Sequence, residues 1–206
     1  MLIGAGLKRS EHKKAEILAA ARDIFLKEGY ADAGMEAVAR AAGVSTATLY
    51  AYFPSKAELF RTVVVDSVRT MAQPVRESAK AGGDARARLT ALSRAYAEFF
   101  ATPATRAMFR MVTAERRRFE GVADHFLGAA RESLGGAAIQ VVQELKASGE
   151  LKVDKPSWAA GQLMGMLDHA TLVLGLSAGD EVQPDRPVTQ IAEDAVETFL
   201  ARYGPG

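Results

Sequence analysis

Residues 45–56 bring hydroxyl groups, aromatic rings and one lysine together in a short stretch, Ser45-Thr-Ala-Thr-Leu-Tyr-Ala-Tyr-Phe-Pro-Ser-Lys56. Threonine hydroxyls can hydrogen-bond base edges in a DNA major groove, and their methyl groups can contact thymine. Tyrosine hydroxyls, and an ammonium group at the start of a helix, can bind phosphate oxygens. This stretch therefore predicts the binding of duplex DNA.

Covalent catalysis is not indicated by the residue types present. The chain has no cysteine, and no Ser-His-acid arrangement is recognisable in it. His125 follows Asp124, and His169 follows Asp168. Adjacent residues on a helix point apart rather than toward a shared metal. We therefore expect no metal, no cofactor and no enzymatic activity, with a small hydrolase that uses an apolar cavity as a distant alternative.

The stretch reads as the second half of a helix-turn-helix. Gly43 separates two short apolar-periodic runs, and glycine permits the positive φ that turns one helix sharply into the next. Ser45 then provides an N-cap for a helix that runs to about Tyr52. With Val44, Leu49 and Phe53 turned inward, the outer face carries Thr46, Ala47, Thr48, Tyr50, Ala51 and Tyr52.

Two further helices position this unit. An apolar stripe over residues 11–28 predicts a first helix that ends at Gly29, giving a three-helix headpiece. Residues 55–58 form a capping box, so a fourth helix starts beside Lys56 and runs toward residue 80, with a kink or break near Pro74. Ahead of the first helix, the basic residues Lys8, Arg9, Lys13 and Lys14 are either a DNA-following arm or a solvated tail.

The segment from Ala41 to Lys56 resembles the DNA-binding motif of the TetR family of transcriptional regulators, and residues 17–30 resemble that family's first helix. The resemblance implies phosphate contacts for the tyrosines and the lysine and base-facing positions for the small residues. The DNA-binding set that we expect is Ser45, Thr46, Ala47, Thr48, Tyr50, Ala51, Tyr52 and Lys56.

The motif departs from the family pattern at two places. Ala33 and Gly34 stand where threonine followed by serine or threonine is usual, which removes hydroxyls that often reach a phosphate. Asp32 or the Gly34 backbone would then cap the second helix. Ala47 stands where glycine is common, which stiffens the recognition helix and adds a methyl group to its DNA face.

The composition is that of an ordinary soluble protein. The chain has 206 residues, 49% of them apolar, and a formal net charge of +1, so it is no polycationic nucleic-acid coat. No secretory signal and no apolar run of membrane-spanning length is recognisable. We expect a cytoplasmic protein with no membrane partner.

The remaining chain reads as helical throughout. We expect an all-α protein of about nine helices, divided into a DNA-binding domain (1–54) and a larger ligand-binding and dimerisation domain (55–206). The expected last two helices, about 156–177 and 187–203, are unusually apolar, and two copies of such a pair would form a four-helix bundle. Burial within the chain is the alternative. The dimer-interface residues that we expect are Leu167, Ala170, Leu174, Ile191, Ala195 and Phe199.

The central helices carry flexible and aromatic apolar residues, which favour an adaptable apolar pocket. The resemblance implies that a small molecule binds there and weakens DNA binding, although each residue alone is more often simple core. The candidate ligand-binding residues are Met71, Phe100, Met108, Met111, Val112, Phe126, Gln162, Met166 and His169. The run Arg116–Arg118 is a solvated face or a site for an anion or DNA.

The predicted function is a homodimeric, ligand-responsive transcriptional regulator of double-stranded DNA. We expect a repressor that a small apolar or amphipathic effector releases from a palindromic operator. The body also resembles the AcrR-like efflux-repressor branch of the family through Phe109-Arg-Met-Val-Thr-Ala-Glu115. A transcriptional activator or a ligand-independent regulator of the same fold is the alternative, and a protein-binding helical module is a third reading.

Overall fold

The structure, a computed structural model, describes residues 3–117, 119, 122–179 and 181–205, with side chains from residue 10 onward except at 122 and 123. These residues form helices and connecting loops, and no strand occurs among them, so the all-α prediction is confirmed. They fall into two compact units. Unit 1 comprises Met1–Ser67 and Met111–Phe126, and unit 2 comprises Val68–Arg110 and Leu127–Gly206.

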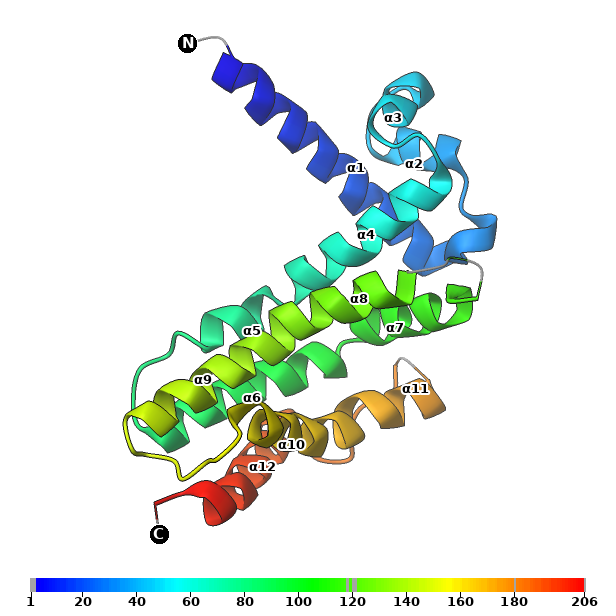
Figure 1. The fold of residues 1–206 in the computed structure, drawn as a ribbon. Coiled ribbons are helices and arrows are strands. Elements are labelled where there is room, and N and C mark those ends of the chain that lie inside the picture. The colour runs from blue at the N-terminus through cyan, green and yellow to red at the C-terminus, as the bar shows by residue number, and fades with distance from the viewer. Residues whose placement is uncertain (1–2, 118, 120–121, 180, 206) are drawn as a thin grey trace. The chain divides into compact units, whose positions relative to one another are not determined.

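Unit 1 contains α1 (Ile3–Asp32), α2 (Met35–Ala41), α3 (Thr46–Tyr52) and the first part of α4 (Lys56–Met71) (Figure 1). Helix α1 packs against α2, and α2 packs against α3. Gly29 breaks the helical backbone of α1 with a φ of 76°, at the position where the sequence predicts the helix end. The core of unit 1 is apolar: Ile17, Leu18, Ala21, Phe25, Val38, Ala39, Leu49, Phe53, Leu59 and Phe60 are buried.

The turn between α2 and α3 has the geometry that the sequence predicts. Gly43 takes a φ of 64°, a left-handed conformation that costs a residue with a Cβ more than it costs glycine. The amide of Val44 donates to the Ala39 carbonyl at 2.9 Å, which closes the turn. The predicted helix-turn-helix is therefore present.

Helix α4 ends at Met71, and α5 (Gln73–Ser78) begins immediately afterwards with Pro74 in its first turn. Proline lacks the amide that an uninterrupted helix would need here, and its ring would clash with the carbonyl four residues earlier in such a helix. The break predicted near residue 73 is confirmed.

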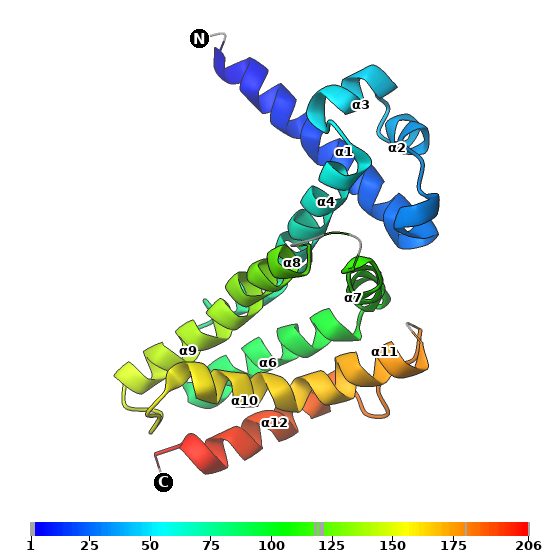
Figure 2. The ribbon, with the colours of Figure 1, turned by 45° about the vertical axis from the view of Figure 1, so that its right-hand side comes forward.

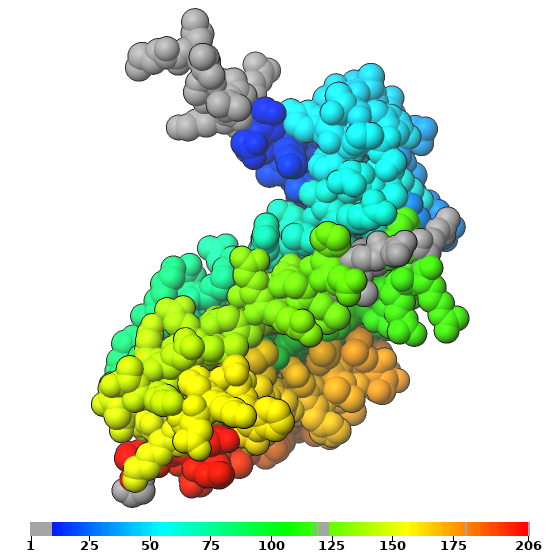
Figure 3. All heavy atoms as spheres, in the orientation of Figure 1, coloured from blue at the N-terminus to red at the C-terminus, as the bar shows by residue number. Residues whose placement is uncertain are grey.

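Unit 2 is organised around α6 (Ala85–Ala101), which packs against α5, α9, α10 and α12 (Figure 2). The other segments are α7 (Pro103–Glu115), α8 (Val122–Ala130), η1 (Arg131–Gly135), α9 (Gly136–Ala147), α10 (Pro156–Asp168), η2 (His169–Val173), α11 (Leu174–Ala178) and α12 (Val188–Tyr203). Helices α9 and α10 also pack together, and their surfaces adjoin in Figure 3. Helices α4, α7 and α8 each contain residues of both units.

Two of the long helices contain a π-helical turn. Segments α8, η1 and α9 follow one another without a loop, as do α10, η2 and α11. When each of these continuous rods is counted once, the described residues form ten helices, close to the roughly nine predicted. The turn η1 ends at Gly135, and π-helical turns within α-helices often occur at functional sites.

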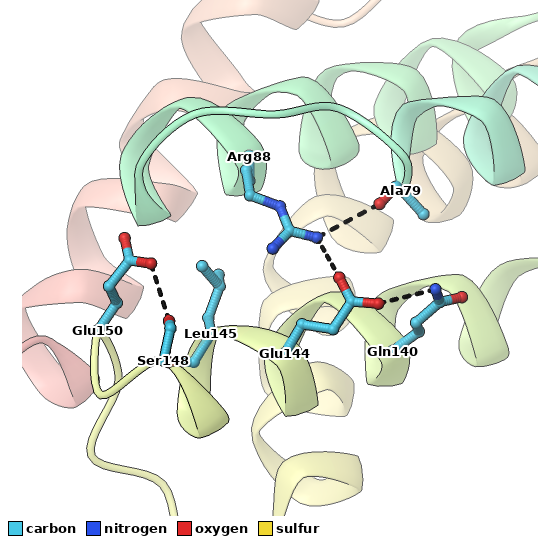
Figure 4. A network of polar contacts seen from close by, with 7 residues as sticks. All are labelled: Ala79, Arg88, Gln140, Glu144, Leu145, Ser148 and Glu150. Carbon is cyan, nitrogen blue, oxygen red and sulfur yellow. Dashed lines mark hydrogen bonds and ion pairs between the residues drawn. The ribbon is translucent and has the colours of Figure 1, made fainter.

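A polar network ties the start of α6 to the end of α9 (Figure 4). Arg88 donates to the Glu144 carboxylate and to the Ala79 carbonyl, and Gln140 donates to the other oxygen of Glu144 at 2.9 Å. The bond from Arg88 is the main cause that lowers the pKa of Glu144 below its ordinary value. Beside this group, the carboxylate of Glu150 accepts from the Ala85 amide at 2.7 Å and so satisfies a free donor at the first turn of α6.

None of the helices that the structure describes combines the length and apolar character that crossing a membrane requires.

Candidate nucleic-acid interface

Helix α3 is started by a side-chain cap. The Ser45 hydroxyl accepts from the Thr48 amide at 3.1 Å and lies 2.8 Å from the Thr48 hydroxyl. Ser45 itself has extended backbone angles, as an N-cap residue should. The predicted cap is confirmed, and the hydroxyl of Thr48 is committed in part to the cap.

One face of α3 is exposed and the opposite face is buried. Leu49 is completely buried, whereas Tyr50 is 47% exposed. Thr46, Ala47 and Ala51 are also exposed, while Thr48 and Tyr52 are half-buried. The exposed face of α3 therefore carries fewer residues than the DNA-binding set expected from the sequence. It presents the side chain of Thr46, the methyl groups of Ala47 and Ala51, and the phenol of Tyr50. Such groups are small enough to enter a major groove, with the phenol able to reach the backbone.

The N-terminal part of α1 lies beside the end of α3. The Ser10 hydroxyl is 3.2 Å from the Tyr52 hydroxyl, although the two residues are 42 positions apart. The backbone of α1 is helical from Ile3, so residues 8–14 lie within α1 and not ahead of the first helix, where the sequence predicts Lys8 and Arg9 to lie. Lys13 pairs with Glu16 at 2.7 Å, and Lys14 is exposed. The side chains of Lys8 and Arg9 lie outside the described residues, as does Arg118 of the later arginine run.

Lys56 occupies the first position of α4, and its ammonium group has two contacts within unit 1. Its Nζ donates to the Ala31 carbonyl at 3.0 Å and lies 4.6 Å from the centroid of the Tyr30 ring. An ammonium group has three donors, so the bond to Ala31 leaves donors for a phosphate. The Glu58 amide donates to the Ser55 hydroxyl at 3.2 Å, which is the forward half of the predicted capping box. Sequence reasoning missed the role of Tyr30, and only its place directly after Gly29 hints at it.

Helix α2 begins without a side-chain cap. Gly34 is the N-cap residue, and no side-chain bond closes it. The Val38 amide donates to the Gly34 carbonyl at 3.1 Å, and the neighbouring Ala33 is buried. The backbone of Gly34 thus takes the capping position, which was one of the two possibilities considered for this departure from the usual motif.

Comparison with known families agrees with this geometry. A family model described as bacterial regulatory proteins of the tetR family matches residues 17–63. A second, described as the C-terminal domain of AefR-like transcriptional repressors, matches residues 87–205, which is more than half of the chain. The chain belongs to the TetR family of transcriptional regulators.

Individual regulators that are similar to this TetR-family chain extend the comparison. A crystal structure of a regulator from Mesorhizobium loti assigned to the TetR family is 26% identical, with a TM-score of 0.88, over 95% of this chain and 98% of that one. The flavonoid-responsive regulator FrrA is 29% identical, with a TM-score of 0.72 and the same coverage. The HTH-type transcriptional activator FasR of Mycolicibacterium smegmatis is 38% identical over 96 residues. That match spans 47% of this chain and 43% of the length of FasR. TetR-family proteins are DNA-binding regulators and not enzymes, and this chain is one of them.

The structure does not gather the nine candidate ligand-binding residues of this TetR-family chain into one unit. Met111, Val112 and Phe126 belong to unit 1, and the other six belong to unit 2. In unit 2, Phe100 and Met108 are buried, while Met71 and Met166 are half-buried against the core. His169 is exposed. Gln162 is exposed as well, and it accepts from the Tyr203 hydroxyl at the edge of a surface groove of about 440 Å³.

The six expected dimer-interface residues also separate in the structure. Ile191, Ala195 and Phe199 are buried in the core of unit 2, because α12 lays its apolar stripe on α6. Leu167 is buried in the same core, and Ala170 is half-buried. Leu174 is 37% exposed. Four of the six residues, Leu167, Ile191, Ala195 and Phe199, are therefore buried within the chain, which was the alternative to a dimer interface.

A partly buried tyrosine–carboxyl pair lies where α6 packs on the α10 rod. The Tyr96 hydroxyl donates to the Asp168 carboxylate at 3.0 Å. Burial raises the pKa of Tyr96 well above its ordinary range, so this hydroxyl stays protonated and remains a donor. Burial also raises the pKa of Asp168, and the bond from Tyr96 opposes that change only in part.

We expect Asp168→Asn to raise the free energy of unfolding at neutral pH by up to about 1 kcal/mol, a modest effect because the carboxyl group keeps some exposure. The folded-state pKa of Asp168 is raised, so its favourable contribution is complete below the unfolded-state pKa and is lost as the pH rises through the folded-state value. The advantage of asparagine should therefore vanish at low pH. Urea unfolding from about pH 4 to pH 8 checks this prediction, and an advantage that grows on acidification would contradict it.

Proposed function

We propose that this TetR-family chain is a ligand-responsive transcriptional repressor that a small apolar or amphipathic molecule releases from a palindromic operator. The observation that carries the proposal is the single exposed face of α3, opposite a completely buried Leu49. The description of the matching C-terminal family, AefR-like transcriptional repressors, supports repression. The resemblance to FrrA, a flavonoid-responsive regulator, supports an amphipathic effector.

We propose that the operator contacts are made by the set expected from the sequence. In it, Thr46, Ala47, Thr48 and Ala51 face bases, and Tyr50, Tyr52 and Lys56 face phosphates. Two copies of α3 in successive major grooves would require half-sites about 34 Å apart, one turn of duplex. Homodimerisation would supply this spacing. The division into a DNA-binding domain (1–54) and a ligand-binding and dimerisation domain (55–206) belongs to the same proposal.

The dimer surface that we propose is the exposed apolar side of the α10–α11 rod. Trp158 is 69% exposed, Val173 46% and Leu174 37%. Gly161 and Gly165 are exposed between them, and no atom lies within 4 Å of where a Cβ would project from either glycine. Small residues between large apolar ones allow a second helix to approach closely, whereas the stripe of α12 is already covered by α6.

An effector acts on DNA affinity only through its differential affinity for two states of the protein. Helices α4, α7 and α8 contain residues of both units, so a ligand that displaces any of them within unit 2 changes unit 1 through a continuous helix. A coupling free energy of about 1–3 kcal/mol corresponds to a change in operator affinity of about 5- to 150-fold.

The test compares operator affinity of the free protein with that of protein saturated by members of a flavonoid and amphipathic aromatic panel. We expect at least one of these ligands to weaken operator binding by about 5-fold or more. Equal affinity across every ligand that binds would contradict ligand-responsive release. Transcription in vitro from the same promoter, with and without the protein, distinguishes repression from activation.

Activation is the second candidate function, and the identity to the activator FasR supports it. That match covers less than half of FasR, so the role of FasR as an activator is carried over to this chain only as a candidate. Activation predicts that added protein raises transcript yield from the operator-bearing promoter, whereas repression predicts that it lowers the yield.

A further inference from the structure

Phe119 is part of unit 1 and packs near Phe60 of α4, although the two residues are almost sixty positions apart in the sequence. It is 7% exposed. Its ring centroid is 4.5 Å from that of Tyr30, at an interplanar angle of 79°, and 5.4 Å from that of Phe60. Phe25 completes the cluster, 5.3 Å from Phe60 and 6.0 Å from Tyr30. Edge-to-face rings at these distances attract beyond their shared burial, so Phe119 restricts where the Tyr30 ring can lie.

The Tyr30 ring also supports Lys56. The ammonium nitrogen of Lys56 lies 4.6 Å from the ring centroid and donates to the carbonyl of Ala31, the next residue in the chain. A shift of Tyr30 therefore displaces the cation–π partner of Lys56 and, through the connecting peptide, its hydrogen-bond acceptor. The position of this ammonium group depends on how Tyr30 is packed.

We infer that Phe119 is a positioning residue for DNA binding, which holds the Lys56 ammonium group in place through the ring of Tyr30. The inference rests on the proposed phosphate contact of Lys56. Phe119 touches no DNA in this account, and its effect on affinity passes through Tyr30 to Lys56. Through Phe119, the segment Met111–Phe126 would then contribute to DNA binding, although in the sequence it lies between two segments of unit 2.

The same geometry links Phe119 to α7. The amide of Phe119 donates to the carbonyl of Glu115, the last residue of α7, at 3.1 Å, so a backbone hydrogen bond joins Phe119 to the end of that helix. Arg61, on α4, lies 6.0 Å from the centroid of the Phe119 ring. A displacement of α7 along its axis is thus passed to the ring that packs on Tyr30.

The first arm of the test measures the Lys56 position without DNA. A proton above an aromatic ring is shifted upfield in NMR spectra, so the ε-methylene protons of Lys56 report its place over Tyr30. We expect Phe119→Leu, which keeps an apolar side chain, to move these resonances toward their random-coil values. The matched control is Phe99→Leu, because Phe99 is also 7% exposed and packs edge-to-face on Phe100 at 4.7 Å in unit 2. Unchanged Lys56 resonances in folded Phe119→Leu would overturn the inference.

The second arm is a double-mutant cycle on operator affinity with Phe119→Leu and Lys56→Met. We expect Phe119→Leu to weaken binding by about three- to ten-fold in the wild-type background, the scale of one aromatic pair. In the Lys56→Met background we expect less than about a two-fold effect, because the positioned group is gone. Equal losses in both backgrounds would overturn the inference and indicate general damage to the headpiece. If Lys56→Met itself leaves affinity unchanged, the proposed phosphate contact fails, and the Lys56 resonances still decide whether Phe119 positions that side chain.

Discussion

Replacing Ala47 with glutamate should lower operator affinity by at least about 100-fold. The new carboxylate would face the negatively charged DNA, and two like charges brought together at an interface cost several kcal/mol. Ala47 is exposed in the first turn of α3, the part of a recognition helix that reaches base edges. The same carboxylate should stabilise the helix by about 0.3–1 kcal/mol, because negative charge is favourable at a helix N-terminus. Loss of DNA binding with unchanged or increased thermal stability is therefore the expected pair of results.

The matched control is Ala47→Gln, which has nearly the same shape as glutamate and no charge. We expect glutamine to reduce affinity much less than glutamate. The difference between the two variants should narrow as salt is added, because salt screens exposed charges. Titration of labelled duplex at several salt concentrations measures both effects. Wild-type affinity for Ala47→Glu would show that this face of α3 does not meet DNA.

Replacing Gly175 with alanine should lower the free energy of unfolding by about 1–3 kcal/mol, the usual cost of overpacking. A Cβ at position 175 would overlap the Nη1 and Cδ atoms of Arg106. Arg106 is the largest fully buried side chain of the described residues, and it is held in place by hydrogen bonds. It donates to the Val182 carbonyl at 2.6 Å and to the Ala101 carbonyl at 3.0 Å. The guanidinium group cannot move aside without losing these bonds.

Gly128→Ala is the control for this prediction. Gly128 lies in α8, is exposed, and has no atom within 4 Å of the position that a Cβ would take. Alanine there should raise the free energy of unfolding by about 0.5–1 kcal/mol through helix propensity. Urea unfolding of the two variants should give opposite signs. A neutral or stabilising Gly175→Ala would mean that Arg106 is not fixed against α11.

The headpiece was predictable because its signals are local. The positive φ of Gly43, the cap at Ser45 and the capping bond at Ser55 each follow from residue types a few positions apart. The break near Pro74 follows from one residue. Such features depend on backbone chemistry within one or two turns, so no knowledge of distant packing is needed.

The sequence predicted that the rest of the chain is helical, but not which helices pack against one another. Periodicity shows that Ile191, Ala195 and Phe199 share an apolar face, yet it does not say whether that face meets a second copy or α6 of the same chain. The structure assigns it to α6. The buried Arg106 gives no periodic signal at all, because a charged residue on a helix reads as exposed.

The contacts in unit 1 between residues far apart in the sequence could not be predicted from the sequence either. Phe119 meets Tyr30 across almost ninety positions, and no local pattern specifies which aromatic residues will cluster. Ser10 meets Tyr52 in the same way. Both contacts lie beside groups proposed to bind DNA, so the packing that positions those groups extends beyond the motif.

The most direct test of the central claim is the affinity of the purified protein for labelled duplex from the region upstream of its own gene, measured across a salt series. Wild type should prefer this duplex over random sequence, and Tyr50→Ala should weaken binding by about ten-fold, as expected for loss of a hydrogen bond to a charged phosphate. Lys56→Met should lower the salt slope by about one, because one phosphate contact is lost. Absence of sequence preference, both for this duplex and in selection from random duplexes, would contradict the account.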